Sequence, residues 1–232
     1  DARRIPKASI SGVTIASMIT PPNNTCPSAI IFDFGGVLLD WDPRHLYRKL
    51  FPGDEQAMER FLSEIGFFEW NYLQDAGRPY AVAVAELCAR HPQYCDLIRA
   101  YDERYPESLG GAIQGTVDIL HRLWSNGLPL FGLSNWPAEK FHLVRPDYEF
   151  FGWFRGIVIS GEVGIAKPDP RIFQALLAQV NRPAGECLLI DDSPANIAVA
   201  QALGFQTIHF HSPQQLASEL ISRGLLPSPQ PQ

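Results

Sequence analysis

The sequence predicts an α/β fold, in which helices cover both faces of a doubly wound parallel sheet and a helical domain is inserted into the chain. Short apolar runs without polar alternation recur along the chain, and such runs are typical of central strands in a parallel sheet. Helical patterns lie between most of these runs, which indicates strand–helix–strand units. The stretch 41–112 breaks this rhythm, because it holds several helical patterns and no convincing strand.

The apolar runs have the length of single strands. The expected strands are residues 29–34, 128–134, 156–160, 186–191 and 206–210. A helix is predicted at 115–124, where Val117, Leu120 and Trp124 share one face. Gly127 supplies its stop.

A second helix is predicted to begin after Asp169. Asp is a preferred N-cap residue, and Pro170 suits the first helical position. The side chains expected to face the sheet are Ile172, Phe173, Leu176 and Leu177.

The interruption of the strand–helix rhythm sets the expected domain organisation. We predict an α/β core at 29–40 and 113–224, a helical cap domain at 41–112, and flexible ends at 1–28 and 225–232. Met18 is a candidate natural start, which would make residues 1–17 a leftover extension. The aromatic residues of the cap are expected to form mostly its own core, namely Trp41, Tyr47, Phe61, Phe67, Phe68, Trp70 and Tyr72.

Composition narrows the classes of function. The 232 residues carry a formal net charge of -6, which leaves no basic face for nucleic acid. No run approaches the roughly 20 apolar residues of a membrane span. The cysteines show neither a C-x-x-C pair nor metal-ligand spacing, so we expect a reducing, cytoplasmic compartment and a small-molecule partner. These cysteines are Cys26, Cys88, Cys95 and Cys187.

Polar residues follow the ends of the predicted strands. In a doubly wound sheet, ligands bind in the crevice at the carboxyl ends of the strands. One edge of the sheet is therefore expected to collect carboxylates, a hydroxyl and an ammonium. The residues are Asp33, Gly35, Ser134, Asn135, Lys167, Asp191 and Asp192.

These residue types suit attack of a carboxylate on a phosphoryl group. Two anions repel each other, so the reaction needs a divalent cation and a fixed ammonium. Asp33 is the candidate nucleophile, Lys167 supplies the ammonium and Asp192 a carboxylate for the cation. Mg²⁺ prefers oxygen ligands and is usually held by one or two carboxylates plus the substrate phosphate. We therefore expect Mg²⁺ as the cofactor, with Ser134 holding further phosphate oxygens.

Four short motifs occur in order along the chain. They are Phe32-Asp33-Phe34-Gly35-Gly36-Val37, Leu133-Ser134-Asn135, Lys167-Pro168-Asp169-Pro170 and Ile190-Asp191-Asp192. Each motif alone is weak, but four at strand ends in the right order are specific. Over residues 29–212 the chain resembles the haloacid dehalogenase-like superfamily, and the insertion is similar to the helical cap of that family's first cap class.

The resemblance implies roles for individual residues. Asp33 would form a covalent aspartyl intermediate, Ser134 would bind the transferred group, and Lys167 would orient nucleophile and substrate. The metal would be bound by Asp33, the backbone carbonyl of Gly35 and Asp192. Asp191 would support the metal ligands without binding the metal itself, and Asn196 would stabilise the loop that follows Asp192. Our candidates for substrate binding are Ser134, Asn135 and Lys167, together with Trp136 and Arg78, which we name from their positions beside Ser134 and in the insertion and not from the resemblance.

One position departs from the family pattern. Most phosphatases of this family have a second Asp two residues after the nucleophile, where this chain has Gly35. That Asp protonates the leaving alcohol, and its loss costs on the order of 10² to 10⁴ in rate unless another group substitutes. Asp40 and Asp42 are candidate substitutes, although solvated loop or helix-capping carboxylates are the plainer interpretation.

Two alternatives stay open. A metal-independent 2-haloacid dehalogenase would need no acid, and Arg44 would then bind the substrate carboxylate, but Asp192 would repel that carboxylate. A non-catalytic binding protein on the same fold has no physical need for the cluster of buried charges.

A polar stretch of the insertion is a further candidate for substrate contact. It comprises Asn71, Asp75, Gly77 and Arg78, and a helix-capping turn is the alternative interpretation. His209 and His211 are expected to be structural. Neither the substrate nor the oligomeric state follows from the sequence.

Overall fold

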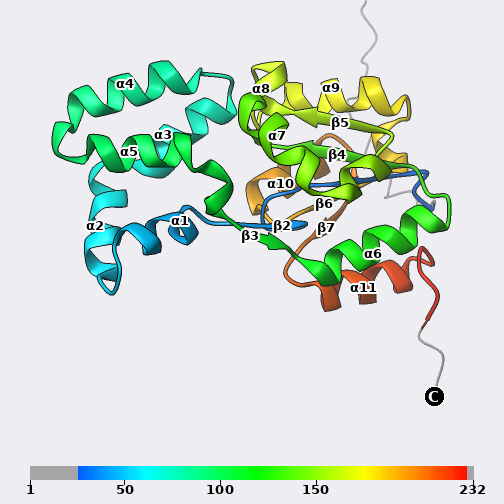
Figure 1. The fold of residues 1–232 in the computed structure, drawn as a ribbon. Helices are drawn as coiled ribbons and strands as arrows, with labels where there is room; N and C mark the ends of the chain where they lie inside the picture. Colours follow the sequence, from blue (N-terminus) through cyan, green and yellow to red (C-terminus); the bar gives the residue numbers. More distant parts are fainter. Residues whose placement is uncertain (1–25, 229–232) are drawn as a thin grey trace, which may run out of the picture.

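A five-stranded parallel sheet forms the centre of the protein in the computed structural model, which describes residues 26–228 (Figure 1). The strand order is β5-β4-β1-β6-β7. The strands are β1 (Ala29–Phe32), β4 (Leu130–Ser134), β5 (Gly156–Ile159), β6 (Cys187–Asp191) and β7 (Gln206–His209). The predicted doubly wound sheet is therefore confirmed, with strands up to a few residues shorter than the apolar runs.

Both faces of the sheet are covered by helices. In β1, Ile30 and Phe32 pack in one apolar cluster, whereas Ala29 and Ile31 pack in a second cluster on the opposite face. The first face is covered by α6 (Gln114–Ser125) and α11 (Pro213–Ser222), and the second by α9 (Pro170–Val180) and α10 (Pro194–Ala202). Because side chains alternate between two buried faces, the strands need apolar residues at every position.

The α9 helix begins as its sequence predicts. The Asp169 side chain accepts a hydrogen bond from the Arg171 N–H at 2.9 Å, and Pro170 is the first helical residue. Ile172, Phe173 and Leu176 are buried as expected, while Leu177 is only partly buried.

The prediction for α6 is correct except at its end. Val117 and Leu120 are buried, but Trp124 is 45% exposed. Its indole instead stacks on Trp153, with ring centroids 5.5 Å apart. Trp124 lies in the last turn of the helix. It packs against the indole of Trp153 and not against the sheet.

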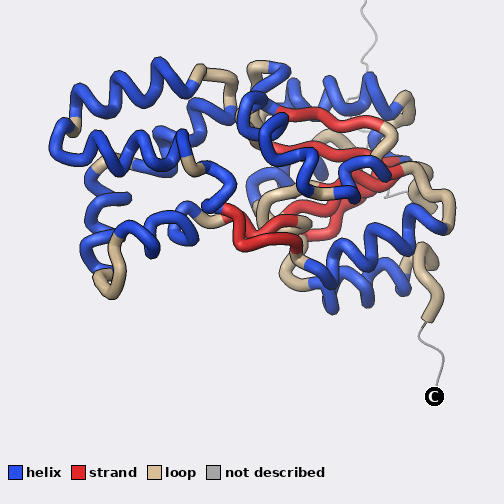
Figure 2. The backbone as a smooth tube through the Cα atoms, viewed as in Figure 1, coloured by secondary structure: helices blue, strands red, loops and turns tan. Residues whose placement is uncertain are grey.

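Residues 43–108, which make up most of the stretch between β1 and β4, are mostly helical and lie to one side of the sheet (Figure 2). We call residues 43–108 the helical insertion. Its helices are α1 (Pro43–Leu50), α2 (Glu55–Glu64), α3 (Phe67–Asp75), α4 (Tyr80–Arg90) and α5 (Cys95–Glu103). Two short strands that the sequence analysis missed, β2 (Leu39–Trp41) and β3 (Leu109–Ala112), pair antiparallel where the insertion joins the core.

Aromatic side chains fill the insertion, as expected for most of them. Tyr101 is fully buried and contacts the rings of Tyr47, Phe67 and Trp70. Phe68 and Tyr72 differ from the prediction, because 45% and 43% of their surfaces are exposed. Both are exposed on α3, although the Phe68 ring still contacts the Phe67 ring at a centroid distance of 5.5 Å.

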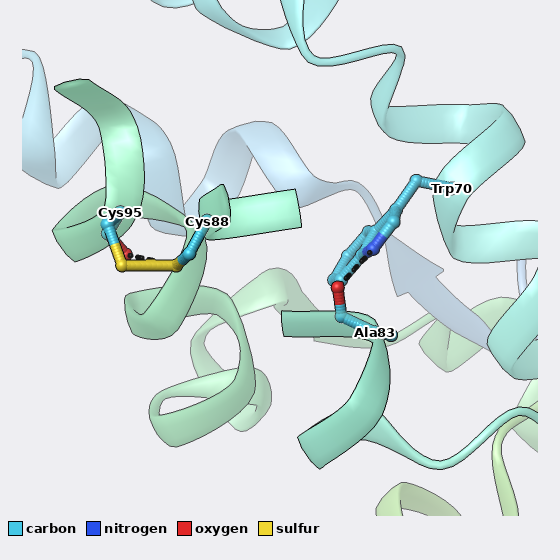
Figure 3. The surroundings of a disulfide bond; sticks show 4 residues. All are labelled: Trp70, Ala83, Cys88 and Cys95. Atoms are coloured by element: carbon cyan, nitrogen blue, oxygen red, sulfur yellow. Dashed lines mark hydrogen bonds between the residues drawn. A yellow bond between two sulfur atoms is a disulfide. The ribbon is translucent and has the colours of Figure 1, made fainter. Parts of the chain in front are cut away.

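A disulfide joins Cys88 and Cys95 across the turn between α4 and α5 (Figure 3). Nearby, the Trp70 indole donates a hydrogen bond to the Ala83 carbonyl at 3.2 Å, which ties α3 to α4. The cysteine spacing did not predict this pairing. Disulfides persist mainly in oxidising compartments, so the bond does not favour the reducing compartment that we expected.

The insertion is fastened to the core through α7 (Ala138–Val144). Lys140 donates to the carbonyl oxygen of Asp102 at 2.8 Å and pairs with its carboxylate. The Tyr80 N–H donates to the Glu139 carboxylate at 3.0 Å. These contacts hold the insertion over the carboxyl ends of the sheet strands.

The ends of the described chain are packed rather than loose. The Ser28 N–H donates to the Glu186 carbonyl, and Leu225 and Leu226, expected in the flexible tail, are buried. The rest of the two predicted flexible segments, residues 1–25 and 229–232, lies outside the described residues. Within 26–228, no helix has the length and apolarity that crossing a membrane requires.

Candidate active site

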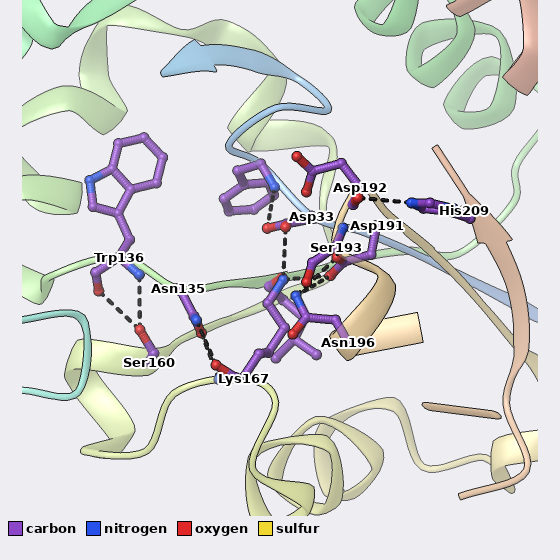
Figure 4. Close-up of polar contacts among 12 residues, drawn as sticks. Asp33, Asn135, Trp136, Ser160, Lys167, Asp191, Asp192, Ser193, Asn196 and His209 are labelled. Atoms are coloured by element: carbon purple, nitrogen blue, oxygen red, sulfur yellow. Dashed lines mark hydrogen bonds and ion pairs between the residues drawn. The ribbon is translucent and has the colours of Figure 1, made fainter. Parts of the chain in front are cut away.

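The carboxyl edge of the sheet brings the predicted polar residues together (Figure 4). Asp33 directly follows β1, Ser134 ends β4, and Asp191 ends β6 with Asp192 after it. Since β1 lies between β4 and β6, these side chains meet at the point where the strand order reverses. Such switch points are the usual ligand sites of doubly wound sheets.

Lys167 is the centre of the polar network. Its Nζ lies 2.9 Å from Asp33 Oδ2 and 2.7 Å from Asp191 Oδ2, and it donates to the Leu133 carbonyl at 2.9 Å. The side chain is 1% exposed. Burial alone would lower the pKa of Lys167, but the charges of Asp191 and Asp33 outweigh it and raise the pKa above its ordinary value. The ammonium therefore stays charged.

Asp33 is fixed at both its backbone and its side chain. Its N–H donates to the Ile190 carbonyl at 2.9 Å, and its Oδ1 accepts the Phe34 N–H at 2.7 Å. Burial raises the pKa of Asp33, Lys167 opposes the rise, and the charges of Asp191 and Asp192 add to it. One ammonium thus does not balance the carboxylates of this edge, and a further cation would relieve the repulsion.

Asp191 is held by donors on all sides. Asn196 Nδ2 lies 2.9 Å and 3.1 Å from its two carboxylate oxygens, and the Ser193 N–H donates to Oδ1 at 2.9 Å. With Lys167 on Oδ2, this carboxylate is fully engaged. Asp191 therefore positions Lys167 and the loop.

Asn135 plays a similar part for the main chain of Lys167. Its Nδ2 donates to the Lys167 carbonyl at 2.9 Å, and its Oδ1 accepts the Lys167 N–H at 2.7 Å. This reciprocal pair fixes the loop that carries the ammonium. The amide of Asn135 is thus largely used inside the protein.

Three carboxylates lie close enough to share a metal ion. Asp33, Asp191 and Asp192 each offer an oxygen within 4.8 Å of the others. Each carboxylate oxygen of Asp191 has two donors, whereas each oxygen of Asp33 has one, so Asp33 and Asp192 are better able than Asp191 to bind a metal ion. Gly36, at φ 72°, leaves the space that Asp192 occupies, because a Cβ there would collide with the Asp192 carboxylate. This set of oxygen donors fits a hard divalent cation such as Mg²⁺.

A cavity of about 60 Å³ lies between the sheet edge and the helical insertion. Gly35, Ser134 and Trp136 line it from the core, and Asn71 and Asp75 line it from the insertion. Its remaining wall consists of Leu39, Trp41, Tyr105, Leu109 and Asn135. The sequence analysis did not name Trp41, Tyr105 and the two leucines as site residues, and no motif marks them.

Residues 27–204 match the model of the haloacid dehalogenase-like hydrolase family. The chain belongs to this family. It is 27% identical over 193 residues to sesquiterpene phosphatase astK of Aspergillus oryzae, covering 78% of this chain and 88% of that protein. It is 40% identical over 211 residues to mouse acyl-CoA dehydrogenase family member 10, covering 83% of this chain but only 18% of the mouse protein.

Solved structures show the same fold. A haloacid dehalogenase-like enzyme of Bacteroides thetaiotaomicron in a magnesium complex superposes with a TM-score of 0.62 at 23% identity, covering 81% of this chain and 95% of that one. The L-2-haloacid dehalogenase of Xanthobacter autotrophicus has a TM-score of 0.58 at 17% identity, covering 87% and 85%. At such identities the likeness concerns the fold alone.

The structure does not bring every candidate of this haloacid dehalogenase-like hydrolase to the cavity. Arg78 donates to Gln74 at 2.8 Å and to Glu86 at 3.0 Å, and it is not part of the cavity wall. The Arg78 side chain is 23% exposed, and its Nη2 is a buried atom without a hydrogen-bond partner among the described residues. Contact of Arg78 with a substrate stays a prediction.

The carboxylates just after β1 have local partners. Asp42 caps α1 by accepting the Arg44 N–H at 2.9 Å, and the Arg44 guanidinium is bound by Glu59. Asp40 lies 3.0 Å from His45 Nε2. These contacts match the plainer interpretation of the two carboxylates, and neither Asp lines the cavity.

His209 makes a contact of its own at the edge of the site. Its Nε2 lies 2.9 Å from the Asp192 carbonyl oxygen, and its ring packs against His211 with centroids 4.1 Å apart. The acidic cluster within the described residues contains neither histidine. His209 thus supports the backbone of the loop that carries Asp192.

Proposed function

We propose that this hydrolase is a phosphatase of a small phosphorylated molecule and works through an aspartyl-phosphate on Asp33. The observation that carries the proposal is the position of Asp33, which is fixed beside the buried ammonium of Lys167 and lies two residues before Gly35 of the cavity wall. The similarity to a protein named sesquiterpene phosphatase supports the same reaction class. Such a nucleophile splits one difficult hydrolysis into two easier displacements.

In the proposed reaction, a carboxylate oxygen of Asp33 attacks phosphorus while the bond to the ester oxygen breaks. Lys167 is held by Asp191 and by the Leu133 carbonyl, so its charge is in place before substrate binds. Preorganised charge of this kind lowers the barrier because nothing has to reorient during the reaction. Water then cleaves the aspartyl-phosphate and releases phosphate.

Two neighbouring residues are proposed to contact or frame the phosphoryl group. Ser134 ends β4 and lines the cavity, where its hydroxyl can donate to a phosphate oxygen. Asn135 is better placed to position Lys167, because both amide atoms bond the main chain of that residue. Trp136 is buried along the cavity wall and is proposed to contact the rest of the substrate.

A divalent cation completes the proposal. The carboxylates of Asp33 and Asp192 and the carbonyl of Gly35 would hold Mg²⁺, and Asp191 would support them from behind through Lys167. When bound, the ion would offset the negative charge of the phosphoryl group. The magnesium complex of the Bacteroides enzyme on the same fold agrees with this expectation.

We propose that the helical insertion acts as the cap over this site and selects the substrate. Residues 41–112 would form the cap, and 29–40 with 113–224 the core. Leu39, Trp41 and Leu109 give the cavity an apolar side opposite the polar sheet edge. A phosphate ester whose organic part is partly apolar fits such a wall. Arg78 stays a candidate for substrate contact, although it does not line the cavity.

A cytoplasmic location stays a prediction of the cysteine pattern. The disulfide between Cys88 and Cys95 weighs against it. Titration of free thiols in protein isolated from its natural source, with and without reductant, decides between a reduced and an oxidised pair.

The test is release of phosphate from p-nitrophenyl phosphate and a panel of phosphate monoesters, with Mg²⁺ and with EDTA. Asp33→Asn removes the nucleophile and is expected to abolish turnover. Asp54→Asn serves as the matched control, since it alters an exposed carboxylate that caps α2. Phosphate release that is independent of Asp33 would contradict the proposal. Halide release from 2-haloacids without metal would favour the dehalogenase instead. Absence of activity in both assays would favour the binding protein.

A further inference from the structure

Asp75 is a carboxylate of the cavity that belongs to none of the four motifs. It ends α3 and lines the cavity from the insertion, opposite Gly35 and Ser134 of the core. The wall residues from the core supply a hydroxyl, an amide and an indole, but none of them carries a carboxyl group. Asp75 is therefore the carboxyl group in the wall of this cavity.

The surroundings of Asp75 offer it little compensation. Its side chain accepts one long hydrogen bond, from Asn71 Nδ2 at 3.3 Å, and within residues 26–228 no Lys, Arg or His forms an ion pair with it. The titratable groups that face it are Asp33, Tyr80, Tyr101 and Tyr105. Burial, with a smaller contribution from the charge of Asp33, raises the pKa of Asp75 to about 7. The group can therefore both carry and release a proton near neutral pH.

The position of Asp75 is fixed by the packing of the insertion on the core. The turn after α3 lies against α8 (Ser160–Val163), where a Cβ at Gly77 would be in van der Waals contact with Gly164 Cα, 3.4 Å away. Tyr80, which follows this turn, is tied to Glu139 of the core. The carboxyl group is thus held over the sheet edge from both sides.

We propose that Asp75 is the general acid and base of this active site. The inference rests on the proposed phosphatase function. Asp75 would protonate the leaving group and later activate water, the two tasks that Gly35 cannot perform because it has no side chain. The inference stands on three observations: the place of Asp75 in the cavity wall, the lack of a cationic partner among residues 26–228, and the packing of the turn that follows it against the core.

The proton balance of the two steps follows from this assignment. As the bond between Asp33 and phosphorus forms and the ester P–O bond breaks, the Asp75 carboxyl gives its proton to the departing oxygen, which leaves as an alcohol. In the second step Asp75, now a carboxylate, takes a proton from the attacking water. The new P–O bond forms, the bond to Asp33 breaks, and both carboxyl groups return to their starting states.

The experiment compares Asp75→Asn with the natural protein on aryl phosphates of increasing leaving-group pKa, from p-nitrophenyl to unsubstituted phenyl. Pre-steady-state release of the phenol isolates the first step. A good leaving group needs no proton, so the burst rate with p-nitrophenyl phosphate should stay within about threefold. With phenyl phosphate it should fall about 10²-fold or more. Steady-state turnover of p-nitrophenyl phosphate should drop after the burst, because the base for the second step is gone.

Controls separate this role from binding or folding. Glu69→Gln removes an exposed carboxylate from the same helix, and it should match the natural protein with every substrate. Equal slowing of all leaving groups, a change confined to KM, or unchanged rates would overturn the assignment to Asp75. If Mg²⁺- and Asp33-dependent turnover is present in the natural protein, the phosphatase proposal stands even when Asp75 fails. If that turnover is absent, both proposals fail together.

Discussion

The sheet edge and the helical insertion hold their polar groups in different ways. At the sheet edge, Lys167 and Asp191 each have three protein partners, and every one of these contacts is shorter than 3.2 Å. In the insertion, Asp75 has one hydrogen bond of 3.3 Å. The contacts at the sheet edge therefore fix the positions of Lys167 and Asp191. The insertion, by contrast, presents a carboxyl group that can gain or lose a proton. We infer that the two regions divide the work between nucleophile and acid.

The largest effect is expected at the sheet edge. Lys167→Met leaves two buried carboxylates without their shared ammonium, so we expect about 3–5 kcal/mol loss in the free energy of unfolding together with loss of phosphatase activity. Urea denaturation measures the first effect and phosphate release the second. Stability equal to that of the natural protein would show that the edge is not held by Lys167.

A smaller effect is expected from the disulfide of the insertion. Cys88→Ser with Cys95→Ser opens a short loop, so the free energy of unfolding should fall by about 2 kcal/mol under oxidising conditions. The burst rate with p-nitrophenyl phosphate should be unchanged, because the nucleophile lies on the other region. As a check, addition of reductant should destabilise the natural protein and leave the variant as it is.

A still smaller effect concerns the pH dependence of stability. Burial raises the pKa of Asp75 to about 7 from an ordinary value near 3.8, so the folded protein binds this proton more tightly than the unfolded chain. Stability from this group is then present below pH 4 and is lost as the pH rises to 7. Relative to the natural protein, Asp75→Asn should gain on the order of 1 kcal/mol between pH 4 and 8, since the cavity side screens part of the charge. Urea titrations of both proteins across this range measure the difference, and a constant difference would contradict it.

The smallest effect is expected where the two regions meet. Lys140→Met removes the ion pair with Asp102 and the contact of Nζ with the Tyr80 ring, whose centroid lies 4.4 Å away. The insertion should close less firmly, so KM should rise about threefold, a change of roughly 0.6 kcal/mol, while the burst rate at saturating substrate stays the same. Lys49→Met, which alters an exposed ion pair with Glu107 inside the insertion, is the matched control.

Prediction from the sequence succeeded where local patterns follow the sheet. The apolar runs predicted the strands because each is buried on both faces, and Asp169 predicted the start of α9 because its side chain caps the backbone. The polar residues at strand ends were brought to one edge by the parallel topology alone. Prediction failed for Trp124, Phe68 and Tyr72, since an aromatic residue does not itself reveal whether a partner surface covers it.

The sequence by itself determined the parallel sheet, its covering helices and the motif residues at its carboxyl edge, because those features depend on local periodicity and strand order. Tertiary structure alone decided which insertion residues face the site. Asp75 and Arg78 stand three residues apart, yet one lines the cavity and the other is held outside by Gln74 and Glu86. The difference comes from the packing of α3 against the core, a contact between segments distant in the chain that no short pattern encodes.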